Sequence, residues 1–256
     1  MPAPDFIIAS PQTGTEYHLQ LAVPAANEAG PWPAVLFLDG DDQFRFAAAA
    51  YRKLRAAGQV PPLLLAGIGY GASYTKPANK RLRDYTPTAM ATEAGSGGAD
   101  PFLAFLTGTL WPVLEERFPL RSDIRGLAGH SLGSLLALHA LFQTRPFFNR
   151  VLASGPALWW DNRALLCEAQ QLQATGAALP ARVFLGVGEQ DSGSMLGDLE
   201  LLEDQLAAQP FPGLQVISQR FPGRDHYNVL PDSFGAGLAG LFGEASQRNV
   251  SSDRSW

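Results

Sequence analysis

A serine enclosed by two glycines is the residue of this chain best placed to act as a nucleophile. Ser131 stands at the centre of Gly129-His130-Ser131-Leu132-Gly133. An apolar stretch from Ile124 leads into this motif, and a run rich in leucine and alanine follows it as far as Leu141. A strand, a sharp turn and a helix in that order form a nucleophile elbow, which lifts the serine hydroxyl above the end of a sheet. Because the turn is strained, we expect a Cβ at either glycine to strike the adjoining strand or helix.

The catalytic base must be one of four histidines, because a serine hydroxyl needs a neighbouring group to take its proton. His18 falls in an expected edge hairpin, and His139 falls inside the helix that follows Ser131. His130 occupies an elbow position from which its ring cannot reach back to the serine hydroxyl. His226 follows the last expected strand, where the base of such a site belongs. We therefore predict that His226 is the catalytic base.

The third member of the site is an acid that orients the imidazole and stabilises its protonated form. In sites built on this type of turn the chain order is serine, acid, histidine. Asp191 lies just beyond the expected strand 182–188 and is our first choice for this role. Glu189 and Asp198 lie close by in the sequence and remain alternatives.

The negative charge of a tetrahedral intermediate requires hydrogen-bond donors that are already in place. One donor is expected to be the backbone N–H of Leu132, at the start of the helix that follows Ser131. The second is expected from the loop after strand 34–38, as the backbone N–H of Asp41. These two N–H groups form the predicted oxyanion hole.

The elements that must position these residues alternate regularly along the chain. Two short segments, 6–10 and 15–23, predict an antiparallel hairpin at a sheet edge. Expected strands follow at 34–38, 63–68, 124–129, 150–153, 182–188 and 214–220, and expected helices at 44–57, 100–118 with an interruption at Pro112, 132–143, 162–174, 195–209 and 233–242. This alternation predicts an α/β fold with a mostly parallel twisted sheet and helices on both faces. Ligands of such sheets bind beyond the carboxyl ends of the strands.

Length and composition favour one domain. The chain has 256 residues, of which 46% are hydrophobic and 17% charged, a balance that can bury a substantial core. We expect a single domain over residues 1–246 and a polar, flexible tail over 247–256. Between Tyr70 and Gly98 no helical period is sustained, so we expect a long loop there that shapes the ligand site.

Several function classes are disfavoured by the sequence. The net charge of −5 and the lack of a Lys/Arg cluster argue against nucleic-acid binding. Cys167 is the only cysteine, so no intrachain disulfide can form. The sequence has no leader pattern and no apolar run long enough for a membrane span, so we expect a cytoplasmic protein, although a trimmed secreted form would read the same. No zinc-like ligand spacing occurs, and we expect neither a metal nor an organic cofactor.

A series of short motifs occurs in one order along the chain. They are Leu38-Asp39-Gly40, Gly67-Ile68-Gly69-Tyr70, Arg83-Asp84-Tyr85-Thr86-Pro87, the Ser131 elbow, Ser154-Gly155-Pro156-Ala157-Leu158-Trp159-Trp160-Asp161, Gly188-Glu189 and His226. Over about residues 6–243 the set resembles the putative-esterase branch of the α/β-hydrolases, and most closely its enterobactin esterase-like (siderophore trilactone hydrolase) group. The resemblance implies an α/β-hydrolase fold and hydrolysis of a small-molecule carboxylic ester through an acyl-enzyme. It implies Ser131 as nucleophile, His226 as base, and the N–H groups of Asp41 and Leu132 as the oxyanion hole.

Three side chains are candidates for contact with substrate. Arg83 lies in the long loop, where it could bind a carboxylate or a polar acyl oxygen, or form a structural pair with Asp84. Trp159 and Trp160 leave the strand beside the elbow, and they could wall the acyl pocket or pack beneath their own loop.

Two further hypotheses stay open. One is acyl transfer to an acceptor other than water, and the other is a non-catalytic ligand-binding protein on the same scaffold. The stretch from Tyr70 to Gly98 carries only Lys76, Lys80, Arg81 and Arg83 as cations, which disfavours a highly anionic ferric-siderophore ligand.

Overall fold

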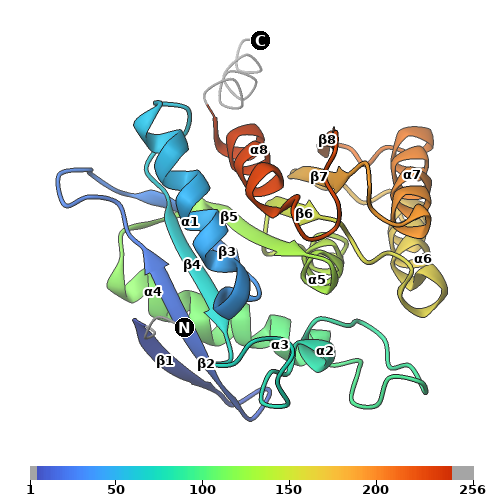
Figure 1. Ribbon diagram of the computed structural model, residues 1–256, viewed down its shortest axis with the longest axis horizontal. Coiled ribbons are helices and arrows are strands. Elements are labelled where there is room, and N and C mark those ends of the chain that lie inside the picture. The colour runs from blue at the N-terminus through green and yellow to red at the C-terminus, as the bar shows by residue number, and fades with distance from the viewer. Residues whose placement is uncertain (1–4, 244–256) are drawn as a thin grey trace.

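One twisted sheet of eight strands organises the molecule in the computed structural model, which describes residues 5–243 (Figure 1). The strands are β1 (Phe6–Ser10), β2 (Thr15–Ala22), β3 (Trp32–Phe37), β4 (Leu64–Gly69), β5 (Leu120–His130), β6 (Arg150–Ser154), β7 (Arg182–Gly188) and β8 (Gln215–Phe221). Their order in the sheet is β1-β2-β4-β3-β5-β6-β7-β8. The β1–β2 and β2–β4 pairs are antiparallel, and all other pairs are parallel. The predicted α/β class and opening hairpin are confirmed, whereas the predicted tail 247–256 lies outside the described residues.

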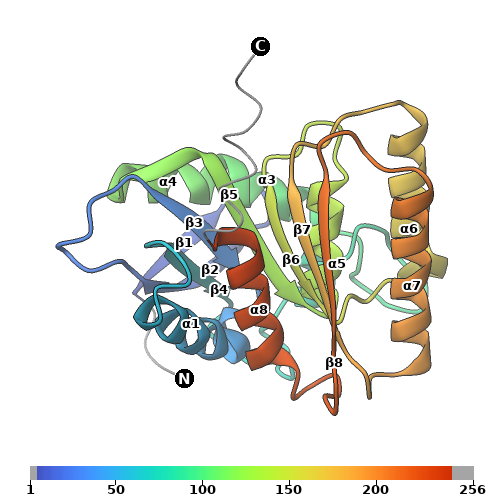
Figure 2. The same ribbon diagram turned by 90° about the horizontal axis from the view of Figure 1, so that it is seen from above.

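Helices cover both faces of this sheet. They are α1 (Gly40–Ala56), α2 (Arg81–Asp84), α3 (Ala99–Phe105), the π-helical segment η1 (Leu106–Leu110), α4 (Trp111–Arg117), α5 (Leu132–Leu141), α6 (Trp160–Ala174), α7 (Gly193–Ala208) and α8 (Leu230–Phe242). Figure 2 shows α1 and α8 on one side of the sheet and α5, α6 and α7 on the other. Two apolar cores result, one on each face. The central strands are buried on both faces, which explains why β4 and β7 read as continuous apolar runs.

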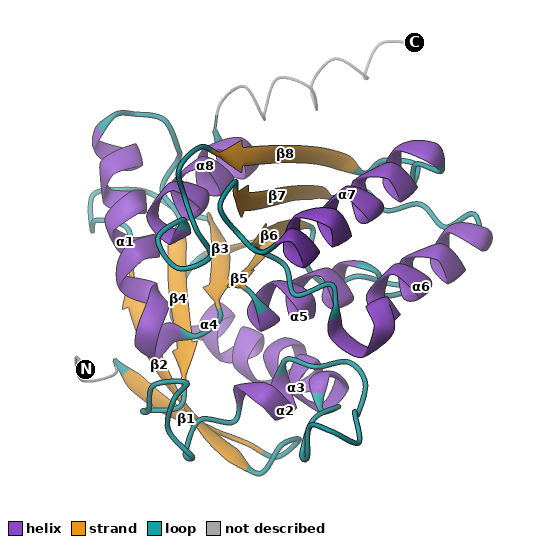
Figure 3. Ribbon diagram, turned by 45° about the vertical axis from the view of Figure 1, so that its right-hand side comes forward, coloured by secondary structure: helices purple, strands orange, loops and turns teal. Residues whose placement is uncertain are grey.

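The parallel strands end at one edge of the sheet, and the loops that matter for chemistry leave from that edge. Figure 3 shows the arrowheads of β7 and β8 pointing to the same side, where the loops after them lie next to each other. The loops are joined by hydrogen bonds: the N–H of Glu189 donates to Phe221 O at 3.1 Å, and that of Gln190 to Arg224 O at 2.8 Å. Crossovers in a parallel sheet therefore bring the turn after β5 and the loops after β7 and β8 to the same edge of the sheet.

Helix α1 begins at Gly40, four residues before the predicted start. Asp39 adopts a left-handed conformation with φ 53° and ψ 42°, which ends β3 abruptly and turns the chain into the helix. Asp41 and Asp42 then stand in the first turn, where negative side chains favour a helix start. The Asp-Gly-Asp-Asp run that looked like a loop is thus a strand-to-helix junction.

The predicted helix 100–118 is present as three consecutive segments, α3, η1 and α4. The N–H of Trp111 donates to Leu106 O, five residues earlier, so the turn before Pro112 is widened. Proline lacks an N–H and clashes with the carbonyl four residues before it, and a wider turn relieves both problems. The interruption expected at Pro112 therefore takes the form of a π-helical turn.

The stretch from Tyr70 to Gly98 is mostly irregular, as predicted, apart from α2 and one isolated bridge between Met90 and Glu93. It is anchored at Asp84, a fully buried residue whose Oδ2 accepts hydrogen bonds from the hydroxyls of Tyr17 at 2.7 Å and Tyr70 at 3.0 Å. Within residues 5–243, no helix is long and apolar enough to cross a membrane.

The two glycines of the elbow differ in how much space surrounds them. A Cβ on Gly129 would lie 2.3 Å from the backbone carbon of Gly133, which excludes any side chain there. A Cβ on Gly133 would meet nothing closer than Leu38 Cβ at 3.4 Å, an ordinary contact. The expectation that both glycines are required by crowding is correct for Gly129 and wrong for Gly133.

The difference in the space around Gly129 and Gly133 predicts opposite effects on stability when each is replaced by alanine. Gly129→Ala forces backbone against backbone and should lower the free energy of unfolding by about 1–3 kcal/mol or more. Gly133→Ala should leave it unchanged or raise it by up to about 1 kcal/mol, because alanine favours the helical conformation that Gly133 already has. Urea unfolding of both variants measures this difference, and equal destabilisation by the two would contradict it.

Candidate active site

Ser131 occupies a strained backbone position between β5 and α5. Its φ of 57° and ψ of −119° are rare for a residue with a side chain. The N–H of Ser131 donates to Ser154 O at 3.0 Å, and Ser131 O accepts from the N–H groups of Ser134 and Leu135. The conformation is thus held from the neighbouring strand on one side and by the first turn of α5 on the other. Backbone strain of this kind persists where a functional side chain must be presented.

His226 and Asp191 are brought together by the loops after β8 and β7. The Nδ1–H of His226 donates to Asp191 Oδ2 at 2.8 Å, and the side chain of Asp191 is only 3% exposed. Burial raises the pKa of Asp191, but the hydrogen bonds from His226 and from the N–H of Ser192 outweigh it and hold the pKa below its ordinary value. Asp191 is therefore a carboxylate at neutral pH. With Nδ1 occupied, Nε2 is the ring nitrogen left to accept a proton.

His226 lies beside the residue that precedes the serine. The rings of His130 and His226 are 4.4 Å apart between centroids. Gly155, directly after β6, lies close to both rings: a Cβ there would be 3.0 Å from His130 Cε1 and 3.2 Å from His226 Nδ1. Among the described residues Ser131 Oγ and His226 share no hydrogen bond.

The two alternative acids are placed elsewhere. Glu189 is exposed in the loop after β7. Asp198 is buried in α7, and its Oδ1 accepts a hydrogen bond from Arg163 Nε at 2.7 Å. Of the three carboxylates considered, Asp191 is the one that contacts His226.

The predicted oxyanion donors lie at the first turns of two helices. Leu132 is the first residue of α5 and Asp41 the second of α1, so their N–H groups have no acceptor within their own helix. The two helix starts are adjacent, because β3 and β5 pair directly and a Cβ on Gly133 would lie 3.6 Å from Asp39 Oδ2. The carboxylate of Asp41 turns away from the helix and accepts from the N–H of Tyr70.

His130, which the sequence considered only as a base and excluded, is a part of the site. It is buried, and its Nδ1 shares a hydrogen bond with Ser154 Oγ at 3.1 Å. Burial, together with the neighbouring His226 and Arg81, lowers the pKa of His130 to about 3. The ring is therefore neutral, and His226 packs beside it with the two ring planes inclined by 42°. Its position inside the elbow motif was the available signal, but only the fold shows that the two rings meet.

Arg81 is a residue that sequence reasoning missed. Its guanidinium binds the fully buried carboxylate of Asp39 through two contacts, Nε–Oδ1 at 2.8 Å and Nη2–Oδ2 at 2.9 Å. Tyr85 supports the pair, because its hydroxyl accepts from the Asp39 N–H at 3.0 Å. The pair fixes Asp39, the left-handed residue directly before α1. It thereby also fixes the position of the Asp41 N–H in the first turn of that helix. Nothing in the spacing of Arg81 and Asp39 marks them as partners.

Arg83, the arginine predicted to meet substrate, is occupied by the protein itself. Its Nε contacts Asp84 Oδ1 at 2.6 Å and its Nη2 donates to Thr15 Oγ1 at 2.8 Å. These contacts favour the structural pair with Asp84 over a substrate contact.

The two tryptophans have separate environments. Trp160 is buried, and its indole Nε1 donates to Thr88 Oγ1 at 3.1 Å and so ties the start of α6 to the long loop. Trp159 remains 45% exposed. Trp160 therefore has the packing role, and Trp159 is the one that stays available to a ligand.

The fold and the site together define the class of protein to which this chain belongs. The order of strands, the strained serine after β5 and the histidine after β8 are those of an α/β-hydrolase fold. The chain belongs to the putative esterase family, because the family model described as "Putative esterase" matches residues 10–205.

Relatives and solved structures agree with this assignment. The siderophore triacetylfusarinine C esterase of Aspergillus fumigatus is 37% identical over 172 residues, which cover 63% of this chain and 58% of that protein. The siderophore enterobactin esterase of Emericella nidulans is 34% identical over 161 residues, covering 57% of this chain and 52% of that protein. This chain thus spans a little over half the length of the two curated relatives. An IroE-like serine hydrolase from Shewanella oneidensis superposes with a TM-score of 0.83 at 25% identity, covering 93% of this chain and 79% of that one.

The buried neutral state of His130 predicts a specific loss of stability in acid. The unfolded chain takes up this proton near the ordinary pKa of 6.5, whereas the folded protein takes it up only near 3. The contribution of His130 to stability is therefore complete above about pH 6.5 and declines by about 1.4 kcal/mol for each pH unit below it. His130→Gln should remove this decline, measured by urea unfolding at several pH values between 7.5 and 4.5. Parallel pH profiles for the two proteins would contradict the assignment.

The buried Arg81–Asp39 pair predicts a large cost when one partner is removed. Asp39→Ala leaves the Arg81 charge without a counter-charge and should lower the free energy of unfolding by about 3–5 kcal/mol. Removing both charges in Asp39→Ala/Arg81→Met should recover most of that loss. Denaturant unfolding of the single and double variants tests this. A loss below about 1 kcal/mol in the single variant, typical of an exposed pair, would contradict it.

Proposed function

We propose that this protein is a serine esterase that hydrolyses a carboxylic ester through an acyl-enzyme intermediate. The observation that carries the proposal is the Asp191–His226 hydrogen bond of 2.8 Å, located beside the elbow that presents Ser131. Membership of the putative esterase family and the esterase names of the two curated relatives support it.

The geometry suits a two-step reaction. Ser131 Oγ attacks the ester carbonyl while His226 Nε2 takes the hydroxyl proton, and the charge that develops on the carbonyl oxygen is stabilised by the N–H groups of Leu132 and Asp41. The C–O bond to the alcohol then breaks, and His226 gives its proton to the leaving oxygen. In the second step water attacks the acyl-enzyme with His226 again as base, which releases the acid and restores Ser131. Asp191 holds one tautomer of His226 and stabilises the imidazolium in both steps.

The substrate class we propose is a small-molecule ester of the siderophore type. The curated relatives are named siderophore esterases. Two exposed aromatic side chains stand close to the catalytic rim: Trp159 is 45% exposed, and Tyr227 is 76% exposed with its ring centroid 5.5 Å from that of His226. Exposed rings at the rim suit a ligand with apolar or aromatic arms that binds over the surface of the site.

Substitutions at the three catalytic positions test this proposal. Ser131→Ala and His226→Ala should each lower kcat with p-nitrophenyl esters by about 10³-fold or more, and Asp191→Asn by about 10²–10⁴-fold. Glu189→Gln is the matched control, because Glu189 lies in the same loop but is exposed, and it should retain full activity. Circular dichroism confirms that each variant is folded.

Two outcomes would overturn the proposal. The first is failure of Ser131 in the folded wild-type protein to label with a fluorophosphonate probe. The second concerns the products formed when a small alcohol is present at low concentration. If the main product is then a new ester rather than the free acid, the reaction is acyl transfer and not hydrolysis.

A further inference from the structure

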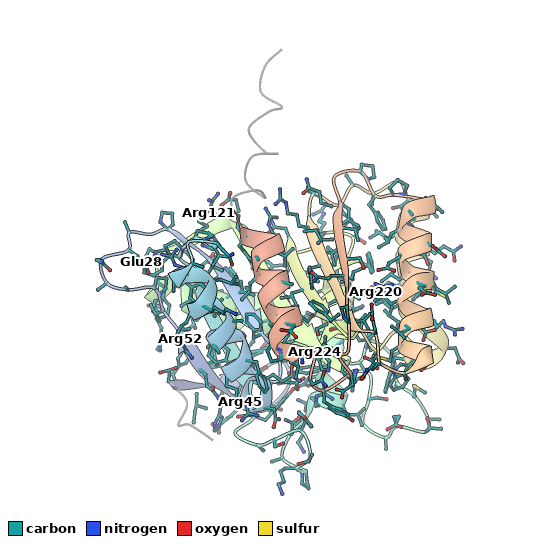
Figure 4. The ribbon with its side chains drawn as sticks, turned by 45° about the horizontal axis from the view of Figure 1, so that its top comes forward. Glu28, Arg45, Arg52, Arg121, Arg220 and Arg224 are labelled. Atoms are coloured by element: carbon teal, nitrogen blue, oxygen red, sulfur yellow. The ribbon has the colours of Figure 1, made fainter. Side chains whose placement is uncertain are left out.

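A second site candidate lies at the opposite edge of the sheet, where the parallel strands begin. A cavity of about 560 Å³ opens there between the first residues of the strands and the last turn of α8. Its lining includes Arg121, Arg150 and Arg182, with Asp123 as its acidic residue. Figure 4 shows Arg121 well separated from Arg224, which lies in the His226 loop.

Arg182 is the most unusual residue of this cavity. It is the first residue of β7 and only 5% exposed. Within residues 5–243 its guanidinium donates no hydrogen bond, and Nη2 is buried without any partner. Buried polar groups in proteins are nearly always hydrogen-bonded, and a bound water or ion is one of the partners that can complete an exception.

Arg150 lies directly beside Arg182 and adds a second positive charge. The two residues are register partners in the parallel β6–β7 pair, so their side chains leave the same face of the sheet. Burial, together with the charge of Arg182, lowers the pKa of Arg150 to about 10, and burial also lowers the pKa of Arg182. Burial is the first cause of both shifts, because it disfavours the charged form of each arginine.

The counter-charges near this pair are already engaged or weak. Asp123 binds Arg121 through Oδ2–Nη2 at 2.6 Å. Arg150 donates only to a neutral acceptor, Asn149 O, at 2.8 Å. The end of α8 contributes the partial negative charge of a helix C-terminus, which does not balance two guanidinium groups. Within the described residues the cavity therefore carries an excess of positive charge.

We propose that this cavity is a binding site for a small oxyanion with two or more negative charges, held by Arg182 and Arg150. Planar guanidinium groups bind phosphate and carboxylate oxygens through paired N–H donors, which suits two adjacent arginines. A tetrahedral oxyanion satisfies the free donors of Arg182 and removes the repulsion between the two arginines at once. Water could accept hydrogen bonds from these arginines, but it carries no negative charge to balance theirs.

Inorganic phosphate is the probe for this site. The midpoint of thermal unfolding is measured in rising phosphate against chloride at matched ionic strength and constant pH. Binding to the folded protein should raise the midpoint in a saturable manner, by roughly 3–6 °C at ten times the dissociation constant. Isothermal titration calorimetry should report one site. Arg182→Met should abolish both signals and leave ester hydrolysis unchanged, because it lies at the other edge of the sheet.

Arg52→Met is the matched control. Arg52 is exposed on α1 (Figure 4), so this variant loses the same charge without touching the cavity and should respond to phosphate like the wild type. Arg182→Lys keeps the charge and should retain a weakened response if Arg182→Met does not fold. The proposal is overturned if phosphate stabilises the wild type no more than chloride does, or if it stabilises Arg182→Met equally. Neither result bears on the esterase proposal, which is measured separately.

Discussion

The conformation of Ser131 is the constraint on which the rest of the site depends. A residue with a side chain at φ 57° costs roughly 1–2 kcal/mol relative to the ordinary regions. The cost is offset because β5 ends in buried residues and α5 is buried along almost its whole length. Gly129 allows the strand and the helix to approach each other closely enough for this turn to form. The strain therefore places the hydroxyl and the N–H of Leu132 at the same point of the sheet edge.

The remaining parts of the site are positioned by neighbouring side chains. His226 is held from two sides, by the buried carboxylate of Asp191 and by the neutral ring of His130. A neutral ring beside His226 matters for the proposed mechanism, because a charged one would oppose the positive charge that a base at this position must gain. Burial of His130 is what keeps it neutral. His130, which the sequence excluded as the base because of its reach, thus still shapes the environment of His226, the proposed base.

Buried charges are paired within the protein at the carboxyl end of the sheet but not at its amino end. At the carboxyl end, Asp39 and Arg81 form a bidentate pair supported by Tyr85, so that both charges are compensated within the protein. At the amino end, Arg150 and Arg182 lie side by side, and the described residues supply no free carboxylate to match them. Leaving a buried charge unpaired costs several kcal/mol. The Asp39–Arg81 pair is already compensated, whereas Arg150 and Arg182 would be compensated by a bound anion. The contrast within one molecule is the reason to regard the amino-end cavity as a site.

The sequence by itself determined the α/β class, the opening hairpin and the order of serine, acid and histidine. These depend on local pattern: apolar runs of strand length, glycines around a serine, and a histidine after the last strand. Only the tertiary structure decided which of three carboxylates meets His226, that Arg81 rather than Arg83 lies by the elbow, and that Gly133 has room for a side chain. Those outcomes depend on distances between residues far apart in the chain. Such distances are set by how strands and helices pack, which no local pattern encodes.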